Sequence, residues 1–261
     1  MQYSLGLALS GGSAKGFLHI GVLHYLEQIA HTPEIISGTS AGALIAVLYA
    51  DGFRPLEIAE LLTKKGFLGM TNFQIPQGGL FSTHNFHNML RKNIRHKRLE
   101  DLEIPIRVLA TDLDKGCSKV FSEGPTVDIV VASCSIPVLF NPVVIDGTYY
   151  VDGGLFKNFP VSTIREDCRT VIGVNLGQEP IEGKYKKKVS AIAQRSFSFI
   201  FGQNARPDRE LCDILIEIDP ETNVPMFNLS LAPKLVKKGF EMAREKINDY
   251  NAHRSETGTG I

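Results

Sequence analysis

Ser40 is the residue best placed for nucleophilic chemistry, because it lies at the centre of Gly38-Thr39-Ser40-Ala41-Gly42. This segment fits G-x-S-x-G, in which a sharp strand-to-helix turn exposes a serine hydroxyl at a helix N-terminus. The flanking glycines let neighbouring elements pass close by. The strand-like Ile35-Ile36 precedes the segment and an apolar run, 43–50, follows it. We therefore expect a nucleophile, with a plain glycine-rich turn as the alternative.

Asp152 is the best candidate for the base that a serine nucleophile needs. A Ser-Asp-His order would require a histidine after the acid. Six of the seven histidines precede Asp112, and His253 lies in a polar tail, so a carboxylate base is expected instead. Asp152 follows the strand-like segment 148–151 and precedes two glycines. On these features alone, a turn explains Asp152 better than a catalytic role does.

A second glycine-rich motif, Ser10-Gly11-Gly12-Ser13-Ala14-Lys15-Gly16, joins a strand-like segment to a helical one. Backbone N–H groups at such a junction bind anions, and the helix dipole favours negative charge. Three interpretations stay open at this point: a phosphate or dinucleotide cradle, an oxyanion hole for acyl transfer, and a simple tight turn. The spacing only approaches G-x-G-x-x-G because Ser13 takes the middle glycine position, and no G-x-x-x-x-G-K-[ST] pattern occurs here.

Short apolar strands alternate with helical patterns along the chain. The predicted strands are 3–9, 35–36, 106–111, 119–121, 143–145, 148–151, 170–175 and 214–218, and the predicted helices are 15–29, 43–50, 54–65, 83–95, 127–134, 189–201 and 233–250. Residues 66–80 and 178–188 are predicted loops, and Asp146-Gly147 predicts a hairpin turn. We therefore predict one α/β domain of three layers, α/β/α, with a mostly parallel central sheet, over residues 1–254 and a polar tail over 255–261.

The composition is that of an ordinary globular protein, with 43% hydrophobic and 21% charged residues. Lys plus Arg equals Asp plus Glu at 28 each, so no overall basic excess points to nucleic acid. No uninterrupted apolar stretch reaches the roughly 20 residues that span a bilayer. The N-terminus also lacks the pattern of a secretory signal. We expect a cytoplasmic protein whose membrane contact, if it has one, is peripheral.

The cysteines and histidines do not indicate a metal site. The four cysteines are irregularly spaced, which is typical neither of a zinc site nor of a disulfide framework, and we expect reduced, mostly buried thiols at Cys117, Cys134, Cys168 and Cys212. His84 and His87 lack a paired carboxylate. Asp112 and Asp114 border a turn, which explains these two residues better than a metal site does. Neither a metal ion nor an organic cofactor is expected.

Taken together, the three motifs resemble those of the patatin-like phospholipase family. The glycine-rich segment, G-x-S-x-G and Asp152-Gly153-Gly154 occur in the order and spacing of that family, and the likeness covers about residues 5–176. Shorter stretches add to it: His19–Leu23, Ala110–Leu113, Ser135–Pro137 with Phe140 and Pro142, and Asn158–Pro160. The resemblance implies a patatin-like fold and a lipid acyl hydrolase with a Ser-Asp dyad, which reverses the interpretation of Asp152 as a turn residue.

The resemblance also implies a role for each motif. Ser40 would attack an ester carbonyl, and Asp152 would accept its proton. An aspartate with the ordinary pKa of about 3.9 is a weak base, so burial should raise the pKa of Asp152. Gly11, Gly12 and Ser13 would donate N–H groups to the oxyanion. The supporting motif positions are Lys15, Gly16, Gly38, Gly42, Gly153 and Gly154.

One departure from the family concerns Ser13, which stands where a third consecutive glycine is usual. A serine would be strained there if the position requires φ > 0, so Gly11 and Gly12 are the safer oxyanion donors. Lys15 takes the family's basic position, where it would steer anionic lipid or hold the loop. Residues 66–80 and 178–205 are candidates for the substrate entrance.

Two other functions remain as alternatives. A nucleotide- or phosphate-binding module would need a ribose-binding acid about 20 residues beyond the glycine-rich segment, at a strand end, whereas Glu34 begins its strand. A non-catalytic membrane or protein adaptor would need neither Ser40 nor Asp152. A basic run over 184–188 precedes an apolar segment that ends at Phe201, which fits an anionic membrane surface, although a solvated loop before a core helix is the plainer interpretation.

Overall fold

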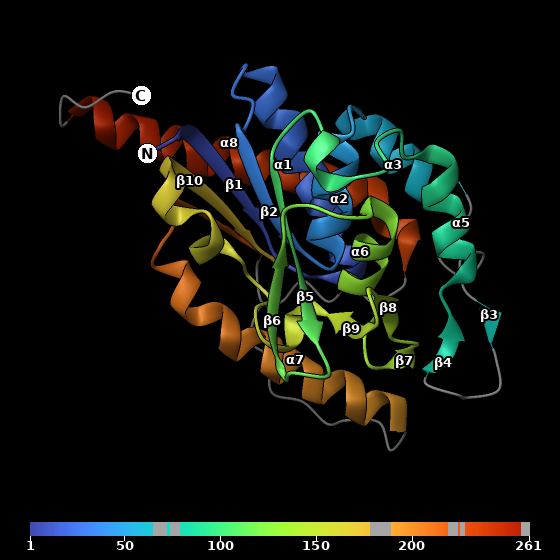
Figure 1. Ribbon diagram of the computed structural model, residues 1–261. Helices are drawn as coiled ribbons and strands as arrows, with labels where there is room; N and C mark the ends of the chain where they lie inside the picture. The colour runs from blue at the N-terminus through green and yellow to red at the C-terminus, as the bar shows by residue number, and fades with distance from the viewer. Residues whose placement is uncertain (65–71, 74–78, 178–188, 219–223, 225–227, 257–261) are drawn as a thin grey trace.

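The computed structural model describes residues 1–64, 72–73, 79–177, 189–218, 224 and 228–256 (Figure 1). Its central sheet has eight strands, in the order β11 (Ile214–Glu217), β10 (Cys168–Asn175), β1 (Tyr3–Leu9), β2 (Ile35–Thr39), β5 (Ile106–Asp112), β9 (Thr148–Asp152) and β8 (Val143–Ile145), with β6 (Cys117–Phe121) paired to β5. The first five strands are mutually parallel, and the other three pair antiparallel. The predicted mostly parallel α/β fold is confirmed.

Helices cover both faces of this sheet. They are α1 (Phe17–Gln28), α2 (Ala41–Ala50), α3 (Pro55–Thr63), α5 (His84–Asn93), α6 (Thr126–Ser133), α7 (Val189–Arg209) and α8 (Ala232–Glu256). Short 3-10 turns are η1 (Ser13–Gly16), η2 (Leu99–Asp101), η3 (Gly153–Leu155), η4 (Val161–Thr163), η5 (Arg165–Asp167) and η6 (Leu229–Leu231). A small second sheet contains β3 (Asn72–Phe73), β4 (Gly79–Ser82) and β7 (Val138–Phe140).

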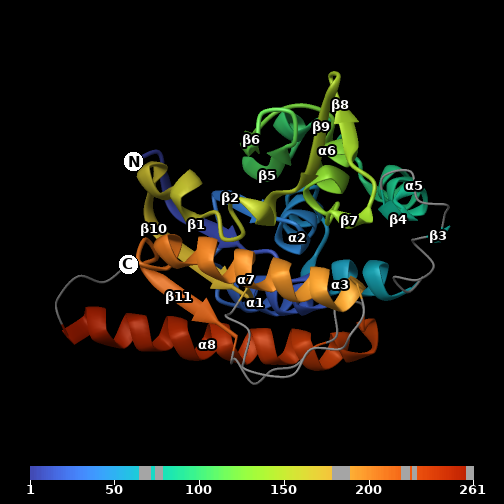
Figure 2. The same ribbon diagram turned by 90° about the horizontal axis from the view of Figure 1, so that it is seen from below.

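Two hydrophobic cores lie on opposite faces of the sheet. Leu7 and Leu9 of β1 belong to the larger core, which α1, α2, α6 and α8 cover. Ala8 points the other way and packs in the smaller core with Phe159 and with Ala205 of α7. Alternate residues of a strand face opposite sides, so β1 is buried on both. Figure 2 shows α8 lying alongside α1 at the large-core face.

Strands β2 and β9 meet end to end along one edge of β5. Thr39, the last residue of β2, pairs with Leu109, and Asp152, the last residue of β9, pairs with Ala110. Because β6 pairs with residues 108–112 of β5, it takes the other edge, and β2 and β9 must share theirs. β2 runs parallel to β5 and β9 antiparallel, so their C-terminal ends face each other. The chain therefore brings residue 40 to residue 152.

The structure agrees with the predicted hairpin and differs in several boundaries. Asp146 and Gly147 have φ values of 50° and 80°, as a tight turn between β8 and β9 requires. β3 and part of β4 lie within 66–80, for which composition predicts a loop, and β7 is not predicted at all. α7 continues eight residues beyond the predicted end at Phe201, to Arg209. α8 extends to Glu256, two residues into the predicted tail, and the rest of that tail lies outside the described residues.

A bilayer-spanning segment is not found among the helices of the described part of the chain, none of which is both long and apolar enough to cross a membrane. The domain boundary at residue 254 stays a prediction. The basic run 184–188 lies outside the described residues.

Candidate active site

Ser40 occupies a strained turn between β2 and α2. Its backbone φ is 53° and ψ is −122°, a conformation that costs an L-residue free energy of about 1–3 kcal/mol. The glycines on either side allow the turn to pack closely. A Cβ atom on Gly42 would lie 2.2 Å from the carbonyl oxygen of Leu9, and one on Gly38 would lie 2.7 Å from Cα of Ala43. The G-x-S-x-G segment therefore forms the sharp turn that its sequence predicts.

Ser40 and Asp152 are joined directly. The Ser40 hydroxyl donates a 2.7 Å hydrogen bond to Asp152 Oδ2, and the Gly154 N–H donates a 2.8 Å hydrogen bond to Oδ1. Asp152 has no exposed surface. Burial raises the pKa of Asp152 to about 7, against the opposite effect of the two hydrogen bonds. At neutral pH the carboxyl group can thus both accept and return a proton, as a general base must.

The backbone around this pair is held by hydrogen bonds to two other segments. The Ser40 N–H donates to Ser133 Oγ at 2.8 Å, and the Asp152 N–H donates to the Ser135 carbonyl at 2.9 Å. The Thr111 hydroxyl donates to the Asp152 carbonyl at 2.9 Å. Sequence reasoning missed Ser133, whose only signal is that it lies two residues before the Ser135–Pro137 stretch.

Cys134 lies in the electrostatic neighbourhood of the Ser40–Asp152 pair. Burial raises the pKa of the Cys134 thiol well above its usual range, and the Asp152 carboxylate raises it further, against a hydrogen bond with the Ser40 side chain. All four cysteines are free thiols, as expected, but only Cys168 is buried: Cys134 and Cys212 are partly exposed and Cys117 is exposed, which differs from the mostly buried thiols expected.

The glycine-rich segment follows β1 and forms η1 beside Ser40. The Gly11 N–H donates to the Asn158 carbonyl at 3.0 Å, so this predicted oxyanion donor is already engaged. Within the described residues, the N–H groups of Gly12 and Ser13 have no such partner. Ser13 has φ of 50°, the left-handed conformation that explains why a glycine suits this position. The strain anticipated for serine is therefore present.

A buried histidine supports the start of this segment. His19 of α1 donates from Nε2 to the Ser10 carbonyl at 2.8 Å. Burial lowers the pKa of His19 to about 4, so its ring is neutral at pH 7 and retains this donor. The Ser10 hydroxyl in turn accepts a 2.7 Å hydrogen bond from the Leu176 N–H. These contacts tie the segment to α1 and to the end of β10.

A cavity of about 200 Å³ opens over Ser40. Its lining comes from seven stretches of the chain: Gly11, Gly12, Ser13, Lys15, Ser40, Ile136, Asn158, Leu176, Gly177, Phe197, Ser198, Phe201 and Val224. Burial lowers the pKa of Lys15, and no carboxylate of the described chain pairs with it. Phe197 and Phe201 belong to α7, and both lie within the predicted entrance region 178–205. The predicted entrance at 66–80 falls largely outside the described residues.

Helix α7 is hydrogen-bonded to the segment that follows Asp152. The Asn204 amide donates to the Gly154 carbonyl at 2.7 Å, and its Oδ1 accepts from the Asn158 N–H at 2.8 Å. Asp208, which is 1% exposed, accepts a 3.0 Å hydrogen bond from Lys157 Nζ. These contacts hold the cavity-lining side of α7 against the site.

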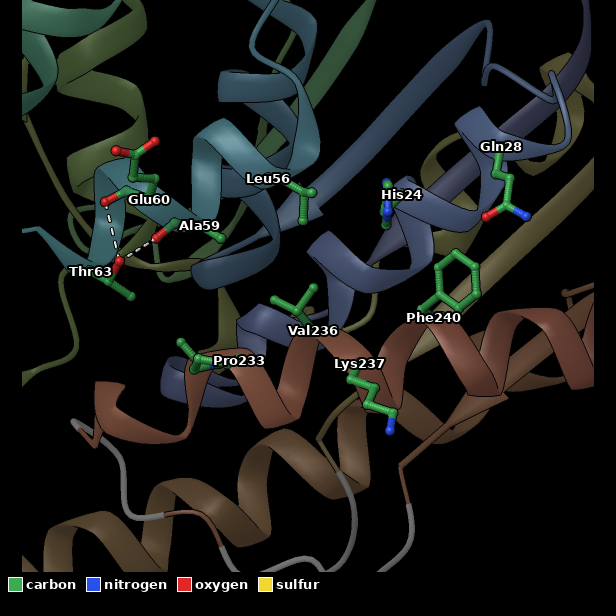
Figure 3. A pocket seen from close by; sticks show the side chains of 11 residues that line it. His24, Gln28, Leu56, Ala59, Glu60, Thr63, Pro233, Val236, Lys237 and Phe240 are labelled. Carbon is green, nitrogen blue, oxygen red and sulfur yellow. Dashed lines mark hydrogen bonds between the residues drawn. The ribbon is translucent and has the colours of Figure 1, made fainter.

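A second hollow, of about 520 Å³, lies between α1, α3 and α8 (Figure 3). Its lining is mostly apolar and includes Leu56, Val236 and Phe240. It is larger than the cavity over Ser40 but contains none of the residues predicted to do chemistry, so we locate the candidate site at Ser40. In the part of the chain that the structure describes, no three His, Cys, Asp or Glu side chains gather as a metal site would require.

Comparison with known proteins finds a matching family model and several relatives. The family model described as patatin-like phospholipase matches residues 7–164. The lysophospholipase NTE1 of Kluyveromyces lactis is 29% identical over 181 residues, which cover 67% of this chain and 13% of that protein. Patatin-like phospholipase domain-containing protein 6 of Mus musculus is 30% identical over 190 residues, covering 67% and 14%.

A bacterial relative and a solved structure are also similar to this chain. An uncharacterised NTE family protein of Mycobacterium tuberculosis is 32% identical over 163 residues, or 61% of this chain and 45% of that protein. The crystal structure of VipD from Legionella pneumophila superposes with a TM-score of 0.55 at 16% identity, covering 96% of this chain and 67% of the other. This likeness supports the fold. The chain thus spans a small part of the first two relatives and under half of the third.

Proposed function

Because this chain belongs to the patatin-like phospholipase family, we propose that it is a serine acyl hydrolase that cleaves fatty acyl esters of lipids. The observation that carries the proposal is the 2.7 Å hydrogen bond from the Ser40 hydroxyl to the buried carboxylate of Asp152. The relatives named lysophospholipases support a lipid substrate. Since they are much longer chains, the substrate remains part of the proposal.

In the first half of the reaction, Asp152 accepts the Ser40 proton while Oγ attacks the ester carbonyl carbon. The carbonyl π bond becomes an oxyanion, which then re-forms the double bond and expels the alcohol. Asp152 gives its proton to the leaving oxygen, so the acyl group remains on Ser40 and the base is ionised again. A pKa of about 7 suits this double task, because a group that both accepts and donates a proton is most effective when its pKa lies near the operating pH.

The second half releases the fatty acid. Asp152 takes a proton from water, the resulting nucleophile attacks the acyl carbon, and the departing Ser40 oxygen recovers a proton from Asp152. Gly12 and Ser13 are the oxyanion donors that we favour, because the Gly11 N–H is held by Asn158. Removal of a single oxyanion donor typically costs about 3–4 kcal/mol of transition-state stabilisation.

Lys15 suggests that the polar end of the substrate is anionic. It lines the cavity with Ser40, and burial lowers the pKa of its ammonium group. An anionic phosphate close to Lys15 would stabilise the charged form that burial disfavours. We therefore propose a phospholipid or lysophospholipid as the substrate class.

Helix α7 is suited to the contact with a lipid surface. Phe197 and Phe201 line the cavity, and their rings stack at 6.0 Å. The outward side carries Ile192, Phe199 and Ile200, which are 51%, 49% and 41% exposed. An apolar outer side next to the substrate cavity would enter the headgroup region and guide an acyl chain inward. A peripheral membrane contact through α7 is therefore part of the proposal.

The nucleotide-binding alternative is less well supported. Its best acidic residue, Glu34, accepts a 2.9 Å hydrogen bond from the Ser4 N–H. Ser4 lies near the start of β1, whereas the glycine-rich segment follows the end of that strand, so Glu34 and the segment lie at opposite ends of the sheet. The acid that would bind a ribose is thus far from the phosphate cradle.

Hydrolysis of a medium-chain p-nitrophenyl ester in the presence of a chelator tests the proposed function. Wild-type protein should turn the ester over, and Ser40→Ala and Asp152→Asn should each lose most of that turnover while staying folded. Equal rates in all three proteins would exclude the dyad. Absence of wild-type turnover on this ester and on lysophospholipid micelles would favour an adaptor role.

A further inference from the structure

The carboxamide of Asn158 is a buried polar group that the Ser-Asp chemistry does not use. Asn158 is 1% exposed, and within the described residues neither its Oδ1 nor its Nδ2 has a hydrogen-bond partner. Leaving buried polar atoms unpaired costs about 1–3 kcal/mol of folding free energy. Because the carboxamide bears this cost without a partner among the described residues, it is suited to form a hydrogen bond with a bound ligand.

The main chain of Asn158 is fully engaged, which fixes where the side chain begins. Its N–H donates to Asn204 Oδ1 at 2.8 Å, and its carbonyl accepts from the Gly11 N–H at 3.0 Å. Asn204 belongs to α7 and also donates to the Gly154 carbonyl. Asn158 is therefore held between the glycine-rich segment, the turn after Asp152 and α7.

Three glycines from separate segments surround the carboxamide. A Cβ atom on Gly11 would lie 2.4 Å from Asn158 Oδ1, and one on Gly154 would lie 3.1 Å from it. A Cβ atom on Gly177 would lie 2.2 Å from Nδ2. The segments leave room for this amide by having no side chain there. Packing alone does not explain the amide, because an apolar group would fill the same space without unpaired polar atoms.

The carboxamide and the nucleophile border the same cavity. Asn158 and Ser40 both line it, as do Gly12 and Ser13. A Cβ atom on Gly11 would also lie 3.3 Å from Cβ of Ser40, so the amide and the serine flank one glycine. A substrate carbonyl attacked by Ser40 enters the same small space.

We propose that Asn158 is a further oxyanion donor, which gives a hydrogen bond from Nδ2 to the substrate carbonyl oxygen as that oxygen becomes negative. It supplies the donor that Gly11 cannot, because the Gly11 N–H is bound to the Asn158 carbonyl. A half-turn about the Cβ–Cγ bond exchanges Oδ1 and Nδ2 beside Gly11, and it breaks no hydrogen bond to the described part of the chain, where neither atom has a partner. This inference rests on the proposed acyl hydrolase function.

The test compares kcat and KM of Asn158→Ala with those of wild type on the p-nitrophenyl ester. An oxyanion donor acts mainly in the transition state, so kcat should fall by about 100- to 1000-fold while KM changes by less than about threefold. The thermal midpoint of Asn158→Ala should not fall, because the side-chain amide makes no hydrogen bond to any described residue. A merely structural asparagine would show the opposite pattern.

Asn141→Ala is the matched control. Its Oδ1 is also buried without a partner, but Asn141 does not line the cavity, so its kcat should equal that of wild type. Asn158→Asp keeps the shape of the side chain and removes both N–H donors, so its kcat should fall to a similar extent. This variant replaces Asn158→Ala as the test if the alanine variant proves unstable.

The outcomes separate this inference from the proposed function. Ester turnover that needs Ser40 but survives Asn158→Ala and Asn158→Asp would overturn the role of Asn158 alone. A wild-type protein without turnover that depends on Ser40 would overturn the hydrolase and, with it, this inference. A drop in the activity of Asn158→Ala that is fully explained by a smaller amount of folded protein would also overturn the role of Asn158.

Discussion

The backbone N–H of Ser40 donates a 2.8 Å hydrogen bond to the hydroxyl of Ser133. This contact joins the strained turn before α2 to the end of α6, across 93 residues of sequence. It satisfies a buried N–H that the turn would otherwise leave without a partner, and it directs that N–H away from any role as an oxyanion donor. Ser133 thus positions the backbone of Ser40, the proposed nucleophile.

We expect Ser133→Ala to lower the free energy of unfolding by about 1–3 kcal/mol, because it leaves the buried Ser40 N–H unpaired. Turnover should fall severalfold, with the larger effect on kcat. Denaturant unfolding and ester kinetics measure the two effects. Ser135→Ala is the control, since its hydroxyl donates to the Val131 carbonyl within α6 and its loss leaves no N–H unpaired. Equal effects of both substitutions would contradict a positioning role for Ser133.

The dependence of kcat/KM on pH should report Asp152. Its ionised form is the base, and burial raises its pKa to about 7, so kcat/KM should rise with pH and level off above 7. Below the inflection, each pH unit should lower the rate about tenfold. A profile that is already flat at pH 5 would show that the reacting base is a different group or an unshifted carboxylate.

Asp152→Asn should make the folded state more stable at pH 8. A group whose pKa is raised on folding contributes stability at low pH, which is lost as pH rises through its folded pKa. For Asp152 the shift from 3.8 to about 7 corresponds to roughly 4 kcal/mol at pH 8. The neutral amide avoids this cost, so its thermal midpoint should exceed that of wild type. The difference should shrink at pH 5, and its absence at pH 8 would mean that Asp152 is not shifted.

Ser13→Gly should stabilise the protein by about 0.5–1 kcal/mol, because Ser13 adopts φ of 50° and glycine does so without steric cost. The N–H group remains, so turnover should stay within about twofold of wild type. Ala30→Gly relieves a similar φ of 55° away from the cavity and serves as the stability control. A large loss of turnover in Ser13→Gly would assign a role to the serine hydroxyl, which Ser13→Ala would then have to reproduce.

Phe199→Ser tests the proposed contact of α7 with lipid. Phe199 is 49% exposed on the side of α7 that faces away from the cavity, so the substitution should reduce activity on phospholipid vesicles severalfold and leave soluble-ester kinetics unchanged. Leu56→Ser removes a similarly exposed residue, 53%, from α3 and should change neither activity. Equal vesicle activity of wild type and Phe199→Ser would argue against this surface as the membrane contact.

Much of the fold can be predicted because its signals are local. Apolar strand runs, helical spacing and the Asp146-Gly147 turn each appear within a few neighbouring residues. The turn at Ser40 can be predicted for the same reason, since its glycines stand beside it. Ser13 shows that a departure from a family pattern also carries information, because its positive φ accounts for the glycine that is usual there.

The parts that the sequence does not predict depend on distant partners. Nothing near Gly11 indicates that its N–H is taken by the carbonyl of Asn158, and nothing near Ser133 indicates its bond to Ser40. β7 is three residues long and has no pattern of its own, since its pairing with β4 defines it. The length of α7 is missed because its polar C-terminal half is held by contacts such as that of Asp208 with Lys157.

The end-to-end meeting of β2 and β9 has a consequence for when the candidate site forms as the chain is synthesised and folds. Residues 40 and 152 face each other only when both strands have docked on β5, and the glycine-rich segment is fixed only once β10 has joined β1. A chain folded only through residue 151 therefore contains Ser40 without Asp152, and one folded only through residue 167 still lacks β10 beside the glycine-rich segment. The proposed hydrolytic activity therefore arises only once the sheet from β10 to β9 has assembled.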